Sequence, residues 1–229
     1  MHKPLILLAA MAFASPSLAA TNLVTNGGFE AGNSGFTSTY NYVTPNANLM
    51  VPENTYTVAS NAANQHPSWA NVGAFAGNNF LIANGSAKSD APVWMQIITG
   101  LEIGRLYDFS AMAVNVCCNA SYGGPNVSPL IISIGSNGTP QTIATSGVLG
   151  STGTWTPFTG SFVATSTSTS LSIFTDVSAA SGNDFGLDEI SVTAAVPEPA
   201  TWMMMMLGMA GVGFSLRRKT QSGPRVRFA

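Results

Sequence analysis

The sequence has 229 residues, of which only 8% are charged, and a formal net charge of −2. Between positions 21 and 195 it has two basic and nine acidic residues, so this stretch carries a net charge of −7. Such a stretch lacks the basic surface that nucleic acids and anionic lipids bind, and we exclude both as ligands of it. Its Asn, Ser, Thr and Gly content is typical of exported all-β domains.

Residues 1–20 have the parts of a secretory signal peptide. Lys3 precedes an apolar run from Leu5 to Ala14, and small residues follow at the expected cleavage positions. The apolar run is too short for an uncleaved anchor. We therefore expect export, with cleavage after Ala19 or Ala20.

Residues 21–195 are predicted to form one all-β domain, a jelly-roll β-sandwich. No stretch keeps a helical period, while short β-branched and aromatic runs alternate with turn pairs such as Asn84-Gly85. The predicted strands are Leu23–Glu30, Thr55–Ala59, Phe80–Asn84, Val93–Ile98, Tyr107–Val116, Leu130–Ile134, Thr156–Ala164, Ser170–Thr175 and Phe185–Thr193. Many short strands separated by strong turn signals favour a sandwich.

The two ends of this domain resemble the first and last strands of galactose-binding-like jelly rolls, a superfamily that includes many carbohydrate-binding modules. The residues concerned are Asn22 to Glu30 and Asn183 to Val192. The resemblance implies that the ends pair as neighbours and hold a structural calcium ion, with Glu30 and Asp188 as its carboxylate ligands. Calcium takes six to eight oxygen ligands. The alternative is that Glu30 and Asp188 are polar residues hydrogen-bonded to turns.

Cys117 and Cys118 are adjacent, and the sequence has no other cysteine. In an oxidising compartment they are expected to form a vicinal disulfide or, alternatively, to link to another chain through one thiol. Such a bond would stabilise the turn or stiffen a loop that presents Tyr122 to a ligand. A zinc site is excluded because these cysteines lack companion ligands.

No catalytic set is recognisable, and we expect no enzyme activity. His66 is the only histidine left after signal removal, and no Ser-His-Asp order is present. A glycosidase needs two carboxylates that face one sugar, and no such pair can be nominated, so glycoside hydrolysis is only a remote alternative.

Carbohydrate binding is the sharper hypothesis, because aromatic rings stack on the apolar faces of sugars while polar groups bind the hydroxyls. Trp69 and Tyr122 fall in predicted loops and are the candidate ligand-binding residues. Trp94 and Trp155 are expected to pack in the core. The rival hypothesis is a structural or adhesive matrix protein without a specific glycan ligand.

The C-terminal tail has three parts in a fixed order. Val196-Pro197-Glu198-Pro199 comes first, an apolar run from Ala200 to Leu216 follows, and Arg217-Arg218-Lys219 ends it. Seventeen residues reach about 25 Å as a helix, slightly short of the roughly 30 Å hydrocarbon core. We expect a single transmembrane helix, with the basic residues and a short extension, residues 220–229, on the cytoplasmic side.

These three parts resemble the tail of PEP-CTERM proteins, a bacterial class whose C-terminal signal, here residues 196–219, is recognised by an exosortase. The resemblance implies an exosortase-type processing enzyme as partner and transient anchoring in the inner membrane. It further implies release to the cell surface or the extracellular matrix, with exopolysaccharide as the expected ligand. The alternative is an ordinary single-helix anchor. The ten residues after the basic stop depart from the usual pattern.

Overall fold

A computed structural model describes residues 21–45, 49–88, 91–118, 130–135, 141–150, 152–175, 183–195 and 201–220. For residues 130–135, 201–204, 215–216 and 218–220 the description covers the backbone alone. The predicted signal peptide, Tyr122 and the stretch Val196 to Pro199 lie outside the described residues. The chain divides into two compact units, Met1–Ala194 and Ala195–Ala229.

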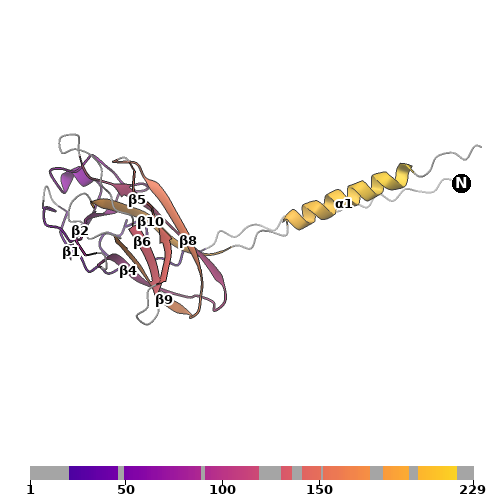
Figure 1. Cartoon of the computed structure of the whole chain (residues 1–229), viewed down its shortest axis with the longest axis horizontal. Coiled ribbons are helices and arrows are strands. Elements are labelled where there is room, and N and C mark those ends of the chain that lie inside the picture. Colours follow the sequence, from indigo (N-terminus) through magenta and orange to yellow (C-terminus); the bar gives the residue numbers. More distant parts are fainter. Residues whose placement is uncertain are drawn as a thin grey trace, which may run out of the picture. The chain divides into compact units, whose positions relative to one another are not determined.

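The first unit is a sandwich of two sheets, which confirms the all-β prediction (Figure 1). One sheet has six strands in the order β1 (Asn41–Tyr42), β2 (Thr55–Ala59), β3 (Phe80–Asn84), β10 (Phe185–Ala194), β5 (Leu106–Asn115) and β8 (Thr156–Val163). The other has four strands in the order β4 (Pro92–Thr99), β9 (Ser168–Thr175), β6 (Leu130–Gly135) and β7 (Gln141–Thr145). Apart from the parallel pair β1 and β2, all of these strand pairs are antiparallel.

The main core lies between the two sheets. Strands β3 and β10 contribute Leu81 and Leu187 from one side, and β4 contributes the fully buried Trp94 from the other. Successive residues of a strand point to opposite faces, so alternate residues enter this core. The unit thus has a hydrophobic core of its own and can fold without the tail.

A second core covers part of the outer face of the six-stranded sheet. Phe80 and Ile82 of β3 point to this face because they alternate with Leu81 and Ala83. The chain between β2 and β3, which includes the 3-10 helix η1 (Ala62–Asn64), folds back over them. This segment covers part of the outer face of the six-stranded sheet, and the candidate sites described below include residues from it.

The two ends of the first unit pair as the jelly-roll resemblance implies. The Leu23 N–H donates to the Val192 carbonyl at 2.8 Å, and the Ile190 N–H donates to the Gly27 carbonyl at 3.0 Å. The predicted strand over Leu23–Glu30 is nevertheless wrong. Asn26 and Phe29 have φ of 54° and 57°, left-handed conformations that an extended strand does not contain.

Two further strands were absent from the prediction. β1 has only two residues, and β7 has the sequence Gln-Thr-Ile-Ala-Thr, in which polar residues outnumber apolar ones. Neither segment carries a hydrophobic alternation long enough to be recognised. The other eight predicted strands form, with ends shifted by at most two residues.

The second unit contains one described helix, α1 (Thr201–Thr220), whose described side chains are exposed. Among the described residues, no helix meets the length and apolarity needed to cross a membrane. The apolar run contains three glycines and ends at Arg217, which lies within the helix itself. The predicted transmembrane helix is therefore not confirmed.

Candidate functional site

The segment Phe75–Asn79, which we call the clamped loop, is held by two carboxylates, Glu30 and Asp188, which lie near the two ends of the β-sandwich sequence. Glu30 Oε1 accepts the backbone N–H groups of Asn78 and Asn79 at 2.8 and 2.7 Å. The hydrogen bonds from Asn79 and Asn78 lower the pKa of Glu30 below its ordinary value. Gly77 is required here, because a Cβ at this position would lie 2.5 Å from Glu30 Oε1 and its φ is +65°.

Asp188, in β10, holds the other end of the clamped loop. Its Oδ2 accepts the N–H groups of Phe75 and Ala76 at 2.9 and 3.1 Å, and its Oδ1 accepts that of Glu189 at 2.8 Å. The side chain is fully buried. Burial raises the pKa of Asp188 from 3.8 to about 6, because it outweighs the three N–H donors that favour the carboxylate.

These contacts are those of the alternative in which Glu30 and Asp188 are hydrogen-bonded to turns. The two donors on Asp188 Oδ2 occupy both of its lone pairs. Asp188 Oδ1 has one donor, and Glu30 Oε2 has one long contact of 3.5 Å with Asn78 Nδ2. Within the described part of the chain, no three acidic, His or Cys side chains gather into a metal-binding group. The residues thus fit a carboxylate clamp, and a calcium site at Glu30 and Asp188 stays a prediction.

A cavity of about 440 Å³ opens beside the clamped loop and the end of β2. Its polar lining comes from Ser60, Asn64, Gln65 and Asn79, and its apolar lining comes from Pro45, Val58 and Ala59. Its volume falls in the range of small-molecule sites, which combine apolar walls with a few polar groups. No local sequence pattern marks this site, because its lining comes from positions spread from 45 to 79.

Phe75 and Trp155 form an aromatic pair at the other end of the clamped loop. The side chain of Phe75 is 49% exposed, and its ring centroid lies 5.9 Å from that of Trp155 at an interplanar angle of 62°. Trp155 is partly buried and contacts Phe80 of the second core. Trp155 thus packs against the second core, as expected, but its side chain is only partly buried.

Trp69 is not the exposed loop residue that the sequence predicted. It is 2% exposed in the second core, and its Nε1–H donates to Asp184 Oδ2 at 2.9 Å. Burial raises the pKa of Asp184, and the Trp69 donor opposes this. The sequence composition indicated a loop, but the loop packs against the sheet. Its ring is therefore not accessible to a sugar.

Cys117 and Cys118 are joined by a disulfide just beyond the end of β5. Cys117 is buried in the second core and pairs with Trp69 through a β-bridge. Tyr122, the residue that this turn was expected to present, lies outside the described residues.

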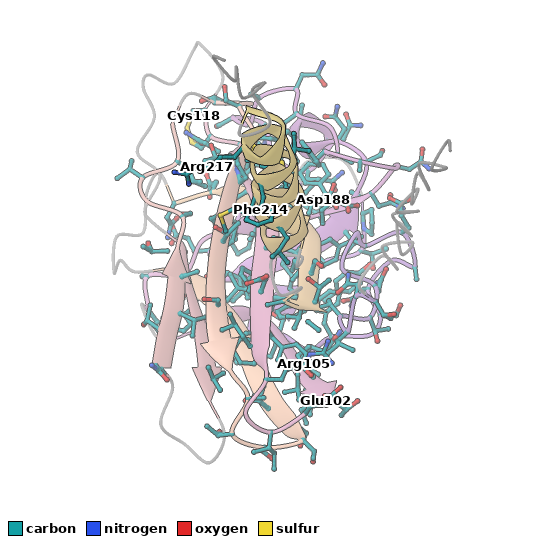
Figure 2. The ribbon with its side chains drawn as sticks, turned by 90° about the vertical axis from the view of Figure 1, so that its right-hand side faces the viewer. Glu102, Arg105, Cys118, Asp188, Phe214 and Arg217 are labelled. Atoms are coloured by element: carbon teal, nitrogen blue, oxygen red, sulfur yellow. A yellow bond between two sulfur atoms is a disulfide. The ribbon has the colours of Figure 1, made fainter. Side chains whose placement is uncertain are left out.

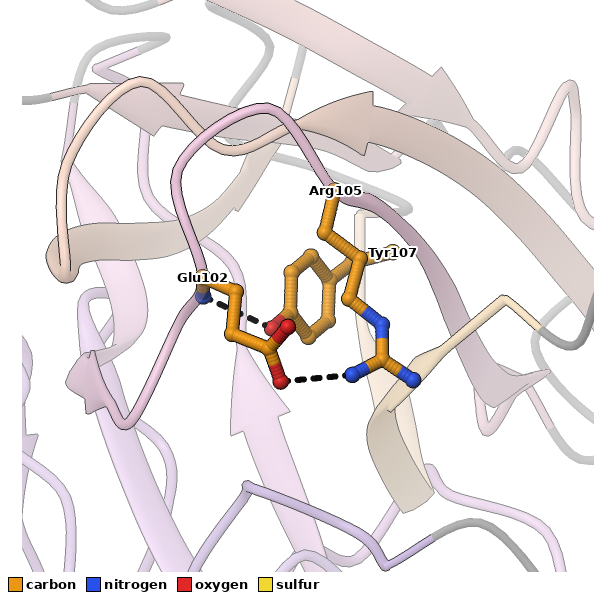
Figure 3. Close-up of polar contacts among 3 residues, drawn as sticks. All are labelled: Glu102, Arg105 and Tyr107. Atoms are coloured by element: carbon orange, nitrogen blue, oxygen red, sulfur yellow. Dashed lines mark hydrogen bonds and ion pairs between the residues drawn. The ribbon is translucent and has the colours of Figure 1, made fainter.

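A surface turn precedes β5, at the end of the sandwich opposite Cys118 (Figure 2). Arg105 Nη1 lies 2.6 Å from Glu102 Oε1, and the Glu102 N–H donates to the Tyr107 hydroxyl at 2.9 Å (Figure 3). Both charged side chains are largely exposed, and such a pair stabilises the fold by less than about 1 kcal/mol. These contacts hold the turn that leads into β5.

Solved structures with this fold include carbohydrate-binding modules. The tandem CBM22-1–CBM22-2 domain of Paenibacillus barcinonensis Xyn10C is 17% identical, with a TM-score of 0.50 over 81% of this chain and 48% of that chain. The CBM22-1 xylan-binding domain of that protein is 14% identical, with a TM-score of 0.49 over 80% of this chain and 99% of its own. The CBM22-1–GH10 modules of Clostridium thermocellum xylanase 10B with xylohexaose are 18% identical, with a TM-score of 0.41 over 55% of this chain and 23% of that chain. At these identities the similarity shows the fold alone.

The C-terminal unit is similar to a known sorting signal rather than to carbohydrate-binding modules. No curated protein matches the chain. Residues 195–219 match the PEP-CTERM protein-sorting motif, which includes Glu198 and Arg217-Arg218-Lys219. The chain thus joins a β-sandwich similar in fold to CBM22 modules to a C-terminal PEP-CTERM protein-sorting motif.

Proposed function

We propose that this is an exported, non-enzymatic protein that binds a neutral carbohydrate in the cavity beside the clamped loop. The observation that carries the proposal is the lining of that cavity, where Asn64, Gln65 and Asn79 stand beside Val58 and Ala59. Amide groups donate and accept hydrogen bonds, so they suit sugar hydroxyls, while the apolar wall suits the C–H faces of the ring. The similarity in fold to carbohydrate-binding modules supports this choice of ligand class.

The electrostatics of the domain favour a neutral sugar over an acidic one. Among the described residues, no charged side chain lines the cavity, and residues 21–195 carry a net charge of −7. An anionic sugar would meet repulsion without a basic partner. Binding should therefore be insensitive to salt, unlike the binding of a charged ligand.

The clamp gives the cavity a fixed wall. Asn79 lines the cavity, and its backbone N–H donates to Glu30 Oε1. A side chain on a held backbone loses less conformational entropy on binding than one on a free loop. Both clamp carboxylates accept backbone N–H groups, so they are not placed as the facing acid and base of a glycosidase.

The test is calorimetric titration of the exported unit, residues 21–195, with neutral oligosaccharides. Asn79→Ala should weaken binding about tenfold, because one or two hydrogen bonds to the sugar are lost. Asn78→Ala is the matched control, because it lies in the same loop and contacts Glu30 but does not line the cavity. Equal effects of the two substitutions, or no binding by the unsubstituted protein, would contradict the proposal.

The sorting motif supports a proposed route to the cell surface or the extracellular matrix. In this route the signal peptide directs export, the tail holds the chain transiently at the inner membrane, and an exosortase-type enzyme removes it. Mass spectrometry of the mature protein from cells checks this. A chain that starts at residue 20 or 21 and ends near Pro199 is expected, and a chain that keeps Arg217 contradicts the route.

We also propose a structural calcium ion at Glu30 and Asp188, following the jelly-roll resemblance. The support is that both carboxylates hold one loop and that each keeps an oxygen with at most one donor. Calcium would add stability to the clamped loop and take no part in sugar chemistry.

A further inference from the structure

We propose that Phe75, Trp155 and the adjoining outer face of β10, β5 and β8 form a second contact surface for the same ligand, which is therefore a polysaccharide rather than a single sugar. We call this surface the aromatic shelf. The inference rests on the proposed function, because it names where further units of the bound glycan lie. It concerns residues that share neither the amide-lined cavity nor the core between the sheets.

Both rings are held in place before any ligand arrives. The Trp155 Nε1–H donates to the Gly73 carbonyl at 3.2 Å, and the Phe75 N–H donates to buried Asp188. The indole also packs at 5.5 Å against the fully buried ring of Phe80. Half of the Phe75 side chain nevertheless remains exposed. A fixed, exposed aromatic ring gains hydrophobic free energy only when a partner covers it.

The strand register places a polar face next to these rings. Asp188, which binds Phe75, pairs with Met112 of β5, and Met112 pairs with Pro157 of β8. The next residues along these strands that point outward carry hydroxyl or carboxyl groups, and each is exposed or half-buried. They are Asp108, Ser110, Thr159, Ser161, Ser191 and Thr193, and the exposed apolar pair Leu106 and Val163 follows at the far end of β5 and β8.

This face is open because the second core covers a different part of the sheet. The described members of that core come from β2, β3, the chain before and between them, and the stretch from Val114, at the end of β5, to Cys117, with Trp155 packed against its edge. The strands alternate, so Tyr107 and Phe109 point inward while Ser110 points outward. The result is an aromatic wall at one end and rows of short hydroxyl side chains beside it.

The side chains of the shelf favour one class of ligand, a neutral polysaccharide. Among the described outward-facing residues of these strands, none is basic, Asp108 is an exposed acid and Asp188 is a buried one, so a nucleic acid, an anionic lipid or an acidic polysaccharide would gain no charge complementarity. Pyranoses with equatorial hydroxyls carry axial C–H groups on both ring faces, which stack on aromatic rings, and their hydroxyls bond to Ser, Thr and Asp. A neutral chain of such sugars can stack on the aromatic rings and also form hydrogen bonds with the hydroxyl side chains of the shelf.

The experiment is titration of residues 21–195 with cellohexaose and xylohexaose, followed by calorimetry and by tryptophan fluorescence. Phe75→Ala should weaken the binding of one of these oligosaccharides by about fivefold to tenfold, because an aromatic contact is lost. Phe75→Tyr should recover most of that loss, because it keeps the ring. Ligand should change the fluorescence of the native protein, and Trp155→Phe should abolish this change, since Trp69 and Trp94 are buried.

The control is Ile97→Ala, which removes a side chain that is 70% exposed on β4 of the other sheet. It should bind as the native protein does. Equal binding by Phe75→Ala and the native protein, or equal weakening by Ile97→Ala, overturns the shelf. If Asn79→Ala weakens binding while Phe75→Ala does not, the shelf fails and the proposed function stands. If the native protein binds no neutral oligosaccharide, the proposed function fails as well. A change of oligomeric state in Phe75→Ala without a change in sugar affinity assigns the surface to self-association and also overturns the shelf.

Discussion

Replacing Gly27 by alanine tests whether the two ends of the sandwich meet as described. A Cβ on Gly27 would overlap the carbonyl oxygen of Ile190 and lie 3.0 Å from its carbonyl carbon, and backbone atoms cannot swing aside as a side chain can. Relief requires the N-terminal segment to move away from β10. That movement breaks the Ile190 N–H bond to Gly27 and the Leu23 N–H bond to Val192, at about 1 kcal/mol each.

The same movement loosens the packing of Phe29, which is fully buried. Exposing that ring costs up to about 1.5–3 kcal/mol. Alanine gives the unfolded chain less conformational entropy than glycine, and this offsets about 0.4–1 kcal/mol of the lost stability. The net loss is roughly 3–4 kcal/mol, or a fall in melting temperature of about 6–16 °C for a domain of this size.

Thermal unfolding of residues 21–195 measures this fall. Gly150→Ala is the matched control, because no atom lies within 4 Å of its Cβ position and its φ is not in the left-handed region, so its melting temperature should barely change. Gly28→Ala should be tolerated, because its Cβ comes close only to the Glu189 carboxylate, at 3.0 Å on an exposed side chain, and lies at an ordinary contact distance of 3.9 Å from Asp188 Oδ1. A Gly27→Ala protein that melts within about 2 °C of the native protein would refute the described pairing.

The remaining predictions concern the carboxylates and the buried tryptophan. Because the pKa of Asp188 is raised from 3.8 to about 6, the folded state holds this proton more tightly, and stability conferred by it is lost as pH rises. We compare the free energy of unfolding in urea of the native protein and of Asp188→Asn, both in the presence of a chelator. Between about pH 4 and pH 6 the native value should fall by up to roughly 3 kcal/mol relative to that of the variant. A difference between the two proteins that does not change with pH would contradict this. If calcium binds Glu30 and Asp188, EDTA should lower the melting temperature of the native protein but not of Glu30→Gln, whereas no effect of EDTA means that the clamp needs no metal. Trp69→Phe should lower the free energy of unfolding by about 1–3 kcal/mol, because buried Asp184 loses a hydrogen-bond donor. Trp155→Phe should lower it less, because the hydrogen bond from Trp155 to Gly73 is exposed. Equal losses would contradict the burial assigned to Trp69.

The sandwich itself was predictable because its strands obey a local rule. Segments such as Phe80–Asn84 and Phe185–Ala194 combine β-branched or aromatic residues with strong turn signals on each side. The Leu23–Glu30 segment has the same composition, yet it forms turns because its Asn-Gly-Gly sequence allows left-handed backbone at Asn26. Composition alone does not distinguish a strand from a turn that pairs with one.

The candidate site was less predictable because it depends on contacts between distant positions. The roles of Glu30 and Asp188 as neighbours at paired ends followed from a resemblance, but the loop that they hold, Phe75–Asn79, carries no local mark of it. Trp69 lies in a segment with the composition of an exposed loop, and only the sheet face beneath it explains its burial. Exposure of an aromatic residue in a loop is a property of the tertiary fold.

The most direct test of the account is the affinity of purified residues 21–195 for neutral polysaccharides at low and high salt. The account predicts measurable binding that is unchanged by salt, because neither the cavity nor the shelf relies on charge pairs. A uniform absence of binding across neutral glycans would contradict the account and favour a purely structural role in the matrix. Binding that disappears at high salt would also contradict it, because such binding depends on charge.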